Sequence, residues 1–285
     1  MTMKRKKYVV ALTVCAVILL LIAIWIIWSN TALELNTYRL VCDDLPESFD
    51  GFRIAHISDL HNNEMGRNHE ELLSMLREAK PDIIAITGDL IDSRKTDFAL
   101  ALSFVKEAVT IAPCYYVTGN HEARISDFDL LKSGLIECGV IVLENEKIEI
   151  DRSVDSVTLI GVNDQSFETN YLLGNSVDVM QNNLQKLTEE NCYTILLSHR
   201  PELMDVYANK GVDLVLSGHA HGGQFRLPFC GGIFAPNQGF FPKYDAGLFE
   251  QDNTTMIVSR GIGNSIFPVR FNNRPEVILI ILESE

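Results

Sequence analysis

Residues 53–89 read RIAHISDLHNNEMGRNHEELLSMLREAKPDIIAITGD, and this stretch decides the fold class. Its two ends, residues 53–58 and 82–87, are short apolar runs typical of buried strands. Between them, leucines and alanine recur at helical spacing over residues 69–79, with charged residues on the opposite side. Pro81 then prevents the helix from continuing. A strand, a helix and a second strand in this order indicate an α/β fold.

The same alternation continues to the end of the chain, which indicates a single domain over residues 51–285. Further strands are expected at 115–118, 140–143, 147–150, 157–162, 193–198, 213–217, 255–259 and 277–282. Helices are expected at 68–79, 97–109, 127–137, 176–187 and 201–209. Residues 29–50 are expected to hold a linker and the first strand.

The N-terminal segment has the features of a membrane anchor. Residues 8–28 contain no charged side chain, and as a helix they span about 30 Å, the thickness of the hydrocarbon core of a bilayer. Four cations precede them at positions 4–7. Because cations favour the cytoplasmic side, residues 1–7 are expected to form a cytoplasmic tail, with the remaining chain on the extracytoplasmic side of the cell membrane.

A cleaved signal peptide is the alternative interpretation, because Asn30-Thr31-Ala32 resembles a weak cleavage site. The apolar region of a signal peptide spans roughly 7–15 residues, and the apolar run here is longer. The length therefore favours a retained, single-pass transmembrane helix.

The rest of the chain is strongly acidic. Four of the 24 Lys and Arg residues lie at positions 4–7, which leaves 20 against 38 Asp and Glu residues and a formal charge of −18 over residues 31–285. Proteins bind nucleic acids largely through Lys and Arg residues that displace counterions from phosphates. The charge therefore excludes nucleic acid as a partner.

Polar residues that suit metal coordination follow five of the apolar runs. The five ends are Asp59-Leu60-His61, Gly88-Asp89, Gly119-Asn120-His121-Glu122, Ser198-His199 and Gly218-His219-Ala220-His221. They contain five of the seven histidines of the chain. A core histidine needs no particular neighbours, whereas a divalent ion needs several imidazole and carboxylate ligands from different segments. Since ligands of α/β sheets bind beyond the carboxyl ends of the strands, these ends predict a metal site.

The spacing within these ends predicts how side chains share a cavity. In an extended chain, alternate side chains point the same way, so Asp59 and His61 form one pair and His219 and His221 another. Glycines precede several of the candidate ligands, where the absent Cβ permits a close approach of the backbone.

The series D-x-H, G-D, G-N-H-E, S-H and G-H-x-H over residues 59–221 resembles the calcineurin-like metallophosphoesterases. Residues 45–61, 218–224 and 259–263 further resemble the bacterial membrane-associated branch of YkuE-like and YaeI-like proteins. The resemblance implies a four-layer αββα sandwich, in which two mixed sheets are flanked by helices.

The resemblance also implies the role of each site residue. It assigns one ion to Asp59, His61, Asp89 and His221, and a second ion to Asp89, Asn120, His199 and His219. A hydroxide between the two ions would attack the phosphate. Asn120 and His121 would contact the substrate phosphate, and His121 would protonate the leaving oxygen. Nitrogen and oxygen ligands without thiolate suit Mn²⁺, Zn²⁺ or iron.

Several other residues allow two interpretations or none. His56 and His69 lie outside the ligand pattern and are expected to be structural. Asp92 and Arg94 resemble part of a phosphatase motif, but their role is unassigned. Residues 225–249 form either an apolar lip, which meets a membrane or an acyl chain, or part of the core. Arg270 either contacts substrate phosphate or is an ordinary surface arginine.

The sequence thus predicts a membrane-anchored, dinuclear phosphoesterase that hydrolyses a phosphate mono- or diester. The anchor favours a lipid-linked or cell-envelope substrate. Soluble nucleotides or phosphoproteins are the alternative substrates. A third hypothesis is an envelope module that binds metal without turnover.

Overall fold

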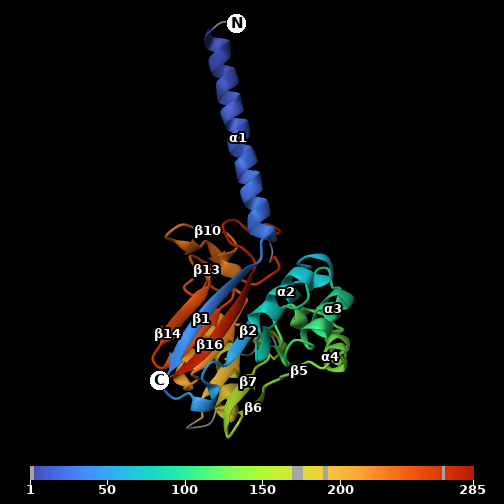
Figure 1. The fold of residues 1–285 in the computed structure, drawn as a ribbon, viewed down its shortest axis with the longest axis vertical. Coiled ribbons are helices and arrows are strands. Elements are labelled where there is room, and N and C mark those ends of the chain that lie inside the picture. Colours follow the sequence, from blue (N-terminus) through green and yellow to red (C-terminus); the bar gives the residue numbers. More distant parts are fainter. Residues whose placement is uncertain (1–2, 169–175, 189–191, 265–266) are drawn as a thin grey trace.

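We describe a computed structural model in which residues 3–168, 176–188, 192–264 and 267–285 are placed. Helix α1 (Met3–Thr31) projects from one end of the remaining structure (Figure 1). Its segment Lys6–Thr31 is long and apolar enough to cross a membrane, and it is exposed over most of its length, although Ser29 in the last turn is buried. Only residues 32 and 33 separate it from the first strand.

The first sheet has six described strands in the order β1-β16-β2-β3-β4-β5. Their bounds are β1 Glu34–Cys42, β16 Glu276–Ser284, β2 Arg53–Ile57, β3 Ile83–Thr87, β4 Cys114–Val117 and β5 Ile141–Val142. Strand β1 is parallel to β16, β16 is antiparallel to β2, and β2 to β5 are parallel. The sheet is therefore mixed, with the two chain-terminal strands side by side.

The second sheet also has six described strands, in the order β14-β15-β9-β8-β7-β6. Their bounds are β14 Gly247–Gln251, β15 Thr254–Val258, β9 Leu214–Ser217, β8 Thr194–Leu197, β7 Asp155–Gly161 and β6 Glu146–Arg152. The central four strands are parallel, and both edge strands are antiparallel to their neighbours. Two short hairpins, β10 (Arg226–Leu227) with β11 (Gly231–Gly232) and β12 (Phe234–Ala235) with β13 (Gly239–Phe240), precede β14.

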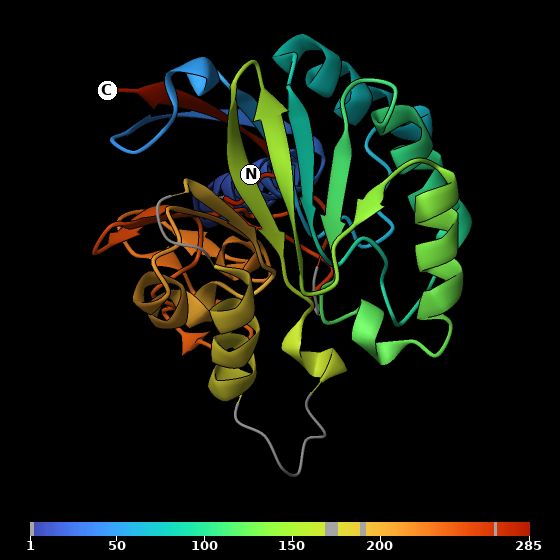
Figure 2. The same cartoon turned by 90° about the horizontal axis from the view of Figure 1, so that it is seen from below.

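The two sheets pack face to face, with helices on both outer sides (Figure 2). Helices α2 (Glu70–Ala79), α3 (Phe98–Ala108) and α4 (Phe128–Glu137) share an apolar core with the first sheet. A second core, which includes Ile54 and Leu216, fills the space between the sheets. Helices α5 (Ser176–Leu187) and α6 (Met204–Asn209) pack with the second sheet around a third core. These layers form the predicted αββα sandwich.

All ten strands and five helices expected from individual apolar runs are present, with ends that shift by a few residues. The last expected helix, at 201–209, begins as a 3₁₀ turn (Pro201–Leu203) before α6. The expected first strand is β1. The sequence did not predict β14 or the two hairpins, because their short runs are interrupted by Gly and Pro.

The strand directions place the candidate ligands at the end of the domain from which α1 emerges. Glu34, at the start of β1, pairs with Glu276, at the start of β16. Because β2 is antiparallel to β16, its carboxyl end lies beside that start, and the carboxyl ends of β3 and β4 follow. The loops after these strands therefore lie at the α1 end, whereas the C-terminus, after β16, lies at the opposite end (Figure 1).

Candidate metal centre

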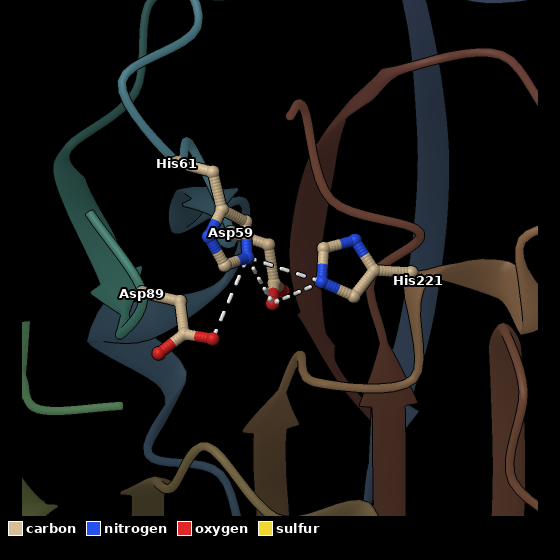
Figure 3. A group of neighbouring side chains, drawn as sticks. All are labelled: Asp59, His61, Asp89 and His221. Carbon is tan, nitrogen blue, oxygen red and sulfur yellow. Dashed lines mark hydrogen bonds and ion pairs between the residues drawn. The ribbon is translucent and has the colours of Figure 1, made fainter. Parts of the chain in front are cut away.

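Four side chains from three separate strand ends converge in a first cluster, which contains Asp59, His61, Asp89 and His221. Figure 3 shows them pointing toward one another. His221 Nε2 lies 3.2 Å from Asp59 Oδ1 and 3.1 Å from His61 Nε2. His61 Nε2 lies 3.5 Å from Asp89 Oδ2. All four side chains are buried, so the cluster concentrates nitrogen and oxygen lone pairs away from water.

Asp89 also belongs to a second cluster, with His199 and His219. Its Oδ2 atom lies 3.3 Å from His199 Nε2. Its Oδ1 atom accepts a hydrogen bond of 2.7 Å from the backbone N–H of His121, the residue after Asn120. The structure therefore brings together the predicted His and Asp ligands of both ions, and Asp89 belongs to both clusters.

The donor atoms of this region fit divalent ions. Asp59 Oδ1, Asn120 Oδ1 and His199 Nε2 are buried and have no hydrogen-bond partner among the described residues. Buried polar atoms are nearly always paired, and an ion is one of the groups that satisfies them. Imidazole nitrogen and carboxylate or amide oxygen, without thiolate, match the donors of Zn²⁺, Mn²⁺ and iron sites.

The backbone conformation of these ligands differs from the extended chain that the sequence interpretation assumed. Asp59, His61, Asp89, His219 and His221 all have φ between 46° and 65°. The alternation of an extended strand therefore does not explain their convergence. His219 and His221 even belong to different clusters. Left-handed backbone is unfavourable for residues with a Cβ and persists where the surroundings impose it, often at functional sites.

The predicted close approach at glycine is confirmed at two positions. A Cβ on Gly119 would collide with the Asp89 side chain, and a Cβ on Gly218 would collide with Ser58 Oγ and Asp59 Oδ2. Both glycines therefore let neighbouring loops approach the ligands directly.

Glu122 holds two of the ligand loops together. Its buried carboxylate accepts hydrogen bonds from the backbone N–H groups of Asp89, Leu90, Ile91 and Gly119. Burial raises the pKa of Glu122 to about 7, and the Asp89 carboxylate contributes to the shift. The sequence interpretation gave this residue no role, although its place in the G-N-H-E motif was a signal.

His121 lies beside the first cluster, with its ring centroid 4.4 Å from that of His61. Its Nδ1 accepts a hydrogen bond of 3.0 Å from the backbone N–H of Ser93. Neutral His121 must therefore carry its proton on Nε2. Burial lowers its pKa to about 4, although the Asp89 carboxylate opposes the shift.

Arg200 and Asn237 are further contacts of the second cluster that the sequence did not reveal. Arg200 Nη1 lies 2.9 Å from both His219 Nε2 and Asn237 Oδ1. Its Nε and Nη2 donate to the two oxygens of buried Asp164, at 2.5 and 2.9 Å. This ion pair fixes the guanidinium beside His219. Arg and Asn have many surface roles, so their types alone gave no signal.

The unassigned pair Asp92 and Arg94 form a two-pronged ion pair next to the site. Arg94 Nε and Nη2 lie 3.0 and 2.7 Å from the Asp92 oxygens. Asp92 Oδ1 also lies 3.4 Å from His121 Nδ1. His56 and His69, expected to be structural, contact Thr87 Oγ1 and the Phe104 ring instead of the clusters.

Arg270 is fully buried, so its interpretation as a surface arginine is wrong. Its Nη2 donates to Gly263 O, while Nε and Nη1 have no hydrogen-bond partner among the described residues. Burial lowers its pKa to about 10, against the opposing effect of Asp59, so it stays charged at neutral pH. The sequence could not show this burial, because the chain around it lacks regular structure.

The core interpretation of residues 225–249 is wrong for several of its aromatic side chains. Phe229 is fully exposed, and Phe240 and Phe241 are 74% and 65% exposed. Their hairpins leave them outside the three cores described above.

Comparison with known proteins assigns the chain to a family. The model of the calcineurin-like phosphoesterase family matches residues 52–223. The chain belongs to this family. The membership predicted from the five motifs is thereby confirmed, and the chain is a phosphoric ester hydrolase of the metallophosphoesterase type.

Individual relatives extend the match over most of the chain. The uncharacterized metallophosphoesterase YkuE of Bacillus subtilis is 30% identical over 258 residues, which cover 88% of this chain and 86% of YkuE. The phosphodiesterase YaeI of Escherichia coli is 28% identical, covering 81% of this chain and 82% of YaeI. These two relatives confirm the predicted branch.

The chain is also similar to a vertebrate transmembrane protein and to a solved bacterial structure. A zebrafish (Danio rerio) transmembrane protein with a metallophosphoesterase domain is 31% identical, covering 85% of this chain and 55% of that protein. Together with α1, this relative supports membrane association. The structure of TT1561 from Thermus thermophilus matches with a TM-score of 0.52 and 13% identity, over 74% of this chain and 90% of TT1561. It supports the fold alone.

Proposed function

We propose that this calcineurin-like protein is a membrane-anchored phosphoesterase that holds two divalent ions and hydrolyses a phosphate mono- or diester on the extracytoplasmic side. The observation that carries the proposal is the position of Asp89, which has Oδ2 within 3.5 Å of both His61 Nε2 and His199 Nε2. One carboxylate between two imidazole clusters is suited to bridging two ions.

The chain's own residues would hold the ions in two sets. Asp59, His61, Asp89 and His221 form the first set, and Asp89, Asn120, His199 and His219 form the second. When bound, two divalent ions lower the pKa of water and neutralise charge on phosphoryl oxygens. Manganese, zinc and iron all suit these donors.

His121 and Arg270 would act on the substrate rather than on the ions. Proton donation to the leaving oxygen would come from Nε2 of the protonated ring, in which Nδ1 faces Asp92 Oδ1 at 3.4 Å. Asn120, next to it, would contact the substrate phosphate as well. Arg270 supplies a buried positive charge with two donor nitrogens that lack partners among the described residues, which suits a phosphate oxygen.

The orientation of the domain supports a lipid-linked or cell-envelope substrate. The ligand loops follow strands whose carboxyl ends lie at the α1 end of the domain. A substrate held in the same bilayer as α1 would meet this end first. The cations at positions 4–7 favour the extracytoplasmic side for the catalytic domain, residues 51–285.

Hydrolysis of a soluble aryl phosphate by the purified full-length protein tests the enzymatic proposal. We expect chelator treatment to abolish hydrolysis and at least one of manganese, zinc or iron to restore it. Hydrolysis that is absent under all these conditions, or unaffected by the chelator, contradicts the proposal.

A substrate panel tests the proposed substrate class. Lipid-linked phosphoesters, nucleotides and phosphopeptides would be compared at equal concentration with the protein in lipid nanodiscs. We expect the lipid-linked esters to have the highest kcat/KM. A preference for nucleotides or phosphopeptides would instead assign the site to soluble substrates.

A further inference from the structure

Five large apolar side chains are exposed on the hairpins β10–β11 and β12–β13 and on the segment before β16. Phe229 lies in the turn between β10 and β11, and Phe240 and Phe241 lie at the end of the β12–β13 hairpin. Leu227 and Phe267 are also exposed, at 42% and 54%. We call these five residues the aromatic face. Clusters of exposed large apolar residues often mark a surface that binds a membrane, a ligand or another protein.

The aromatic face lies beside the end of α1. Figure 1 shows β10 and β13 next to the point where α1 meets the domain. Ser29 Oγ, in the last turn of α1, accepts a hydrogen bond of 3.2 Å from the Asn272 N–H. The preceding residue, Phe271, accepts one of 3.0 Å from the N–H of Arg226, in β10. The hairpins are thus joined to α1 through a short hydrogen-bonded path.

The end of α1 is also held firmly against the domain. The Asn30 side chain exchanges two hydrogen bonds with the Arg270 backbone, at 2.8 and 2.9 Å. Arg274 donates to the backbone oxygens of Ala32 and Leu33, and its guanidinium lies 4.8 Å from the Trp28 ring centroid. Because no flexible linker separates α1 from the domain, a bilayer that surrounds α1 would lie against the neighbouring surface.

The charge of the hairpin segment suits a membrane. Residues 225–249 contain two cations, Arg226 and Lys243, and one carboxylate, Asp245. Arg226 Nη1 lies 2.9 Å from Asp245 Oδ2, so the carboxylate is paired. This segment therefore lacks the negative charge that dominates the rest of the chain and that would oppose contact with anionic lipids.

The same hairpins contact the metal centre. Asn237, in the turn of the β12–β13 hairpin, has its Oδ1 atom 2.9 Å from His219 Nε2. A Cβ on Gly223, two residues after His221, would collide with the backbone of Gly232 in β11. The aromatic face and the candidate ligands therefore belong to one packed unit.

We propose that the aromatic face inserts its side chains into the interfacial region of the bilayer that α1 spans, and so holds the metal centre at the level of the lipid headgroups. Aromatic side chains are favoured at this depth of a membrane. The consequence of insertion, access to lipid-linked phosphoesters, rests on the proposed function. The insertion itself requires only that α1 spans a bilayer, and it does not require hydrolysis.

Fluorescence quenching by brominated lipids tests the insertion. The full-length protein would carry Trp25→Phe and Trp28→Phe, and a single new tryptophan as Phe240→Trp or Phe229→Trp, in nanodiscs. We expect lipids brominated near the headgroup end of the acyl chain to quench both new tryptophans several-fold. The matched control is Val154→Trp, because Val154 is 94% exposed in the turn between β6 and β7, at the opposite end of the domain (Figure 1).

Two results would overturn the insertion. Tryptophan at 240 and 229 that is quenched no more than at 154 would place the aromatic face outside the bilayer. Shielding from aqueous iodide without lipid quenching, in nanodiscs that contain two chains, would assign the face to a second copy of the protein.

A kinetic comparison tests the consequence separately. The double variant Phe240→Ser/Phe241→Ser should hydrolyse a bilayer-embedded phosphoester several-fold more slowly than the unchanged protein, and a soluble aryl phosphate at the same rate. Equal loss on both substrates would contradict a role in membrane access. If the unchanged protein hydrolyses neither substrate, the proposed function fails, while the quenching result still decides whether the face inserts.

Discussion

The Nε2 atoms of His61 and His221 lie 3.1 Å apart, although 160 positions separate the two residues. Both nitrogens lie within 3.7 Å of Asp59 Oδ1. Only one of the two Nε2 atoms can place a proton between the rings. The other Nε2 therefore directs a lone pair toward its neighbouring nitrogen or toward the Asp59 carboxylate. A shared cation satisfies all three atoms, which makes this contact a direct geometric indication of the first proposed ion.

We expect His121→Ala to keep both ions but to lose most turnover. The side chain contacts Ser93 and His61 and is proposed to donate a proton rather than to bind metal. Loss of a general acid lowers kcat by about 10²- to 10⁴-fold. Metal content and aryl phosphate hydrolysis, measured on the same sample, check this expectation. A variant that loses metal would assign His121 to coordination instead.

We expect the ions to be released as the pH falls. Burial opposes the charged form of His199, but the carboxylates of Asp89 and Asp59 outweigh it and raise its pKa to about 10. A proton thus competes with an ion for His199 even at neutral pH, and each further proton removes another ligand. Affinity therefore decreases with falling pH throughout the range below the raised pKa of His199, and little metal should remain at about pH 4. The metal content after dialysis at decreasing pH measures this loss of affinity. Retention of the metal at about pH 4 would contradict the proposed imidazole ligands.

We expect Asp164→Asn to destabilise the fold strongly. Arg200 is buried and makes two hydrogen bonds with the Asp164 carboxylate. Removing the negative charge leaves Glu202, whose Oε1 lies 3.5 Å from Arg200 Nη1, as the remaining carboxylate of this pair, and should cost up to about 3–5 kcal/mol. Chemical denaturation of the full-length protein measures the change. Asp129→Asn, at an exposed carboxylate, is the matched control, and equal stability of the two variants would refute the buried pair's role.

We expect Arg270→Met to weaken substrate binding while both ions remain. Two nitrogens of this buried guanidinium have no partner among the described residues and are available to a phosphate oxygen. Loss of a charged hydrogen bond should raise KM roughly 10- to 100-fold. Arg39→Met, at an exposed arginine, is the control. An unchanged KM together with a large loss of stability would make Arg270 purely structural.

Much of the fold could be predicted because its strands are buried runs with clear helical segments between them. Ile83–Thr87 is apolar and fully buried, so its sequence pattern and its structure agree. The hairpins could not be predicted, since β10 to β13 contain two residues each and depend on contacts such as Asn272 with Arg226. The choice between core and lip for residues 225–249 likewise required the tertiary structure.

The membership of the clusters could be predicted better than their geometry. The predicted His and Asp ligands lie in the two clusters, because the strand ends that carry them meet at one end of the sandwich. Their left-handed backbone, for example φ of 51° at Asp59, is imposed by neighbouring loops and leaves no simple pattern in the sequence. Arg200 and Glu122 were missed for the same reason, since their roles depend on partners from other segments.

The most direct test of the central claim is the metal content of the purified full-length protein after loading with manganese, zinc or iron. We expect two ions per chain, and a loss of bound metal in Asp89→Ala and in His219→Ala but not in Val154→Ala. Fewer than one ion per chain with every metal, or equal metal content in all three variants, would contradict a dinuclear centre built around Asp89.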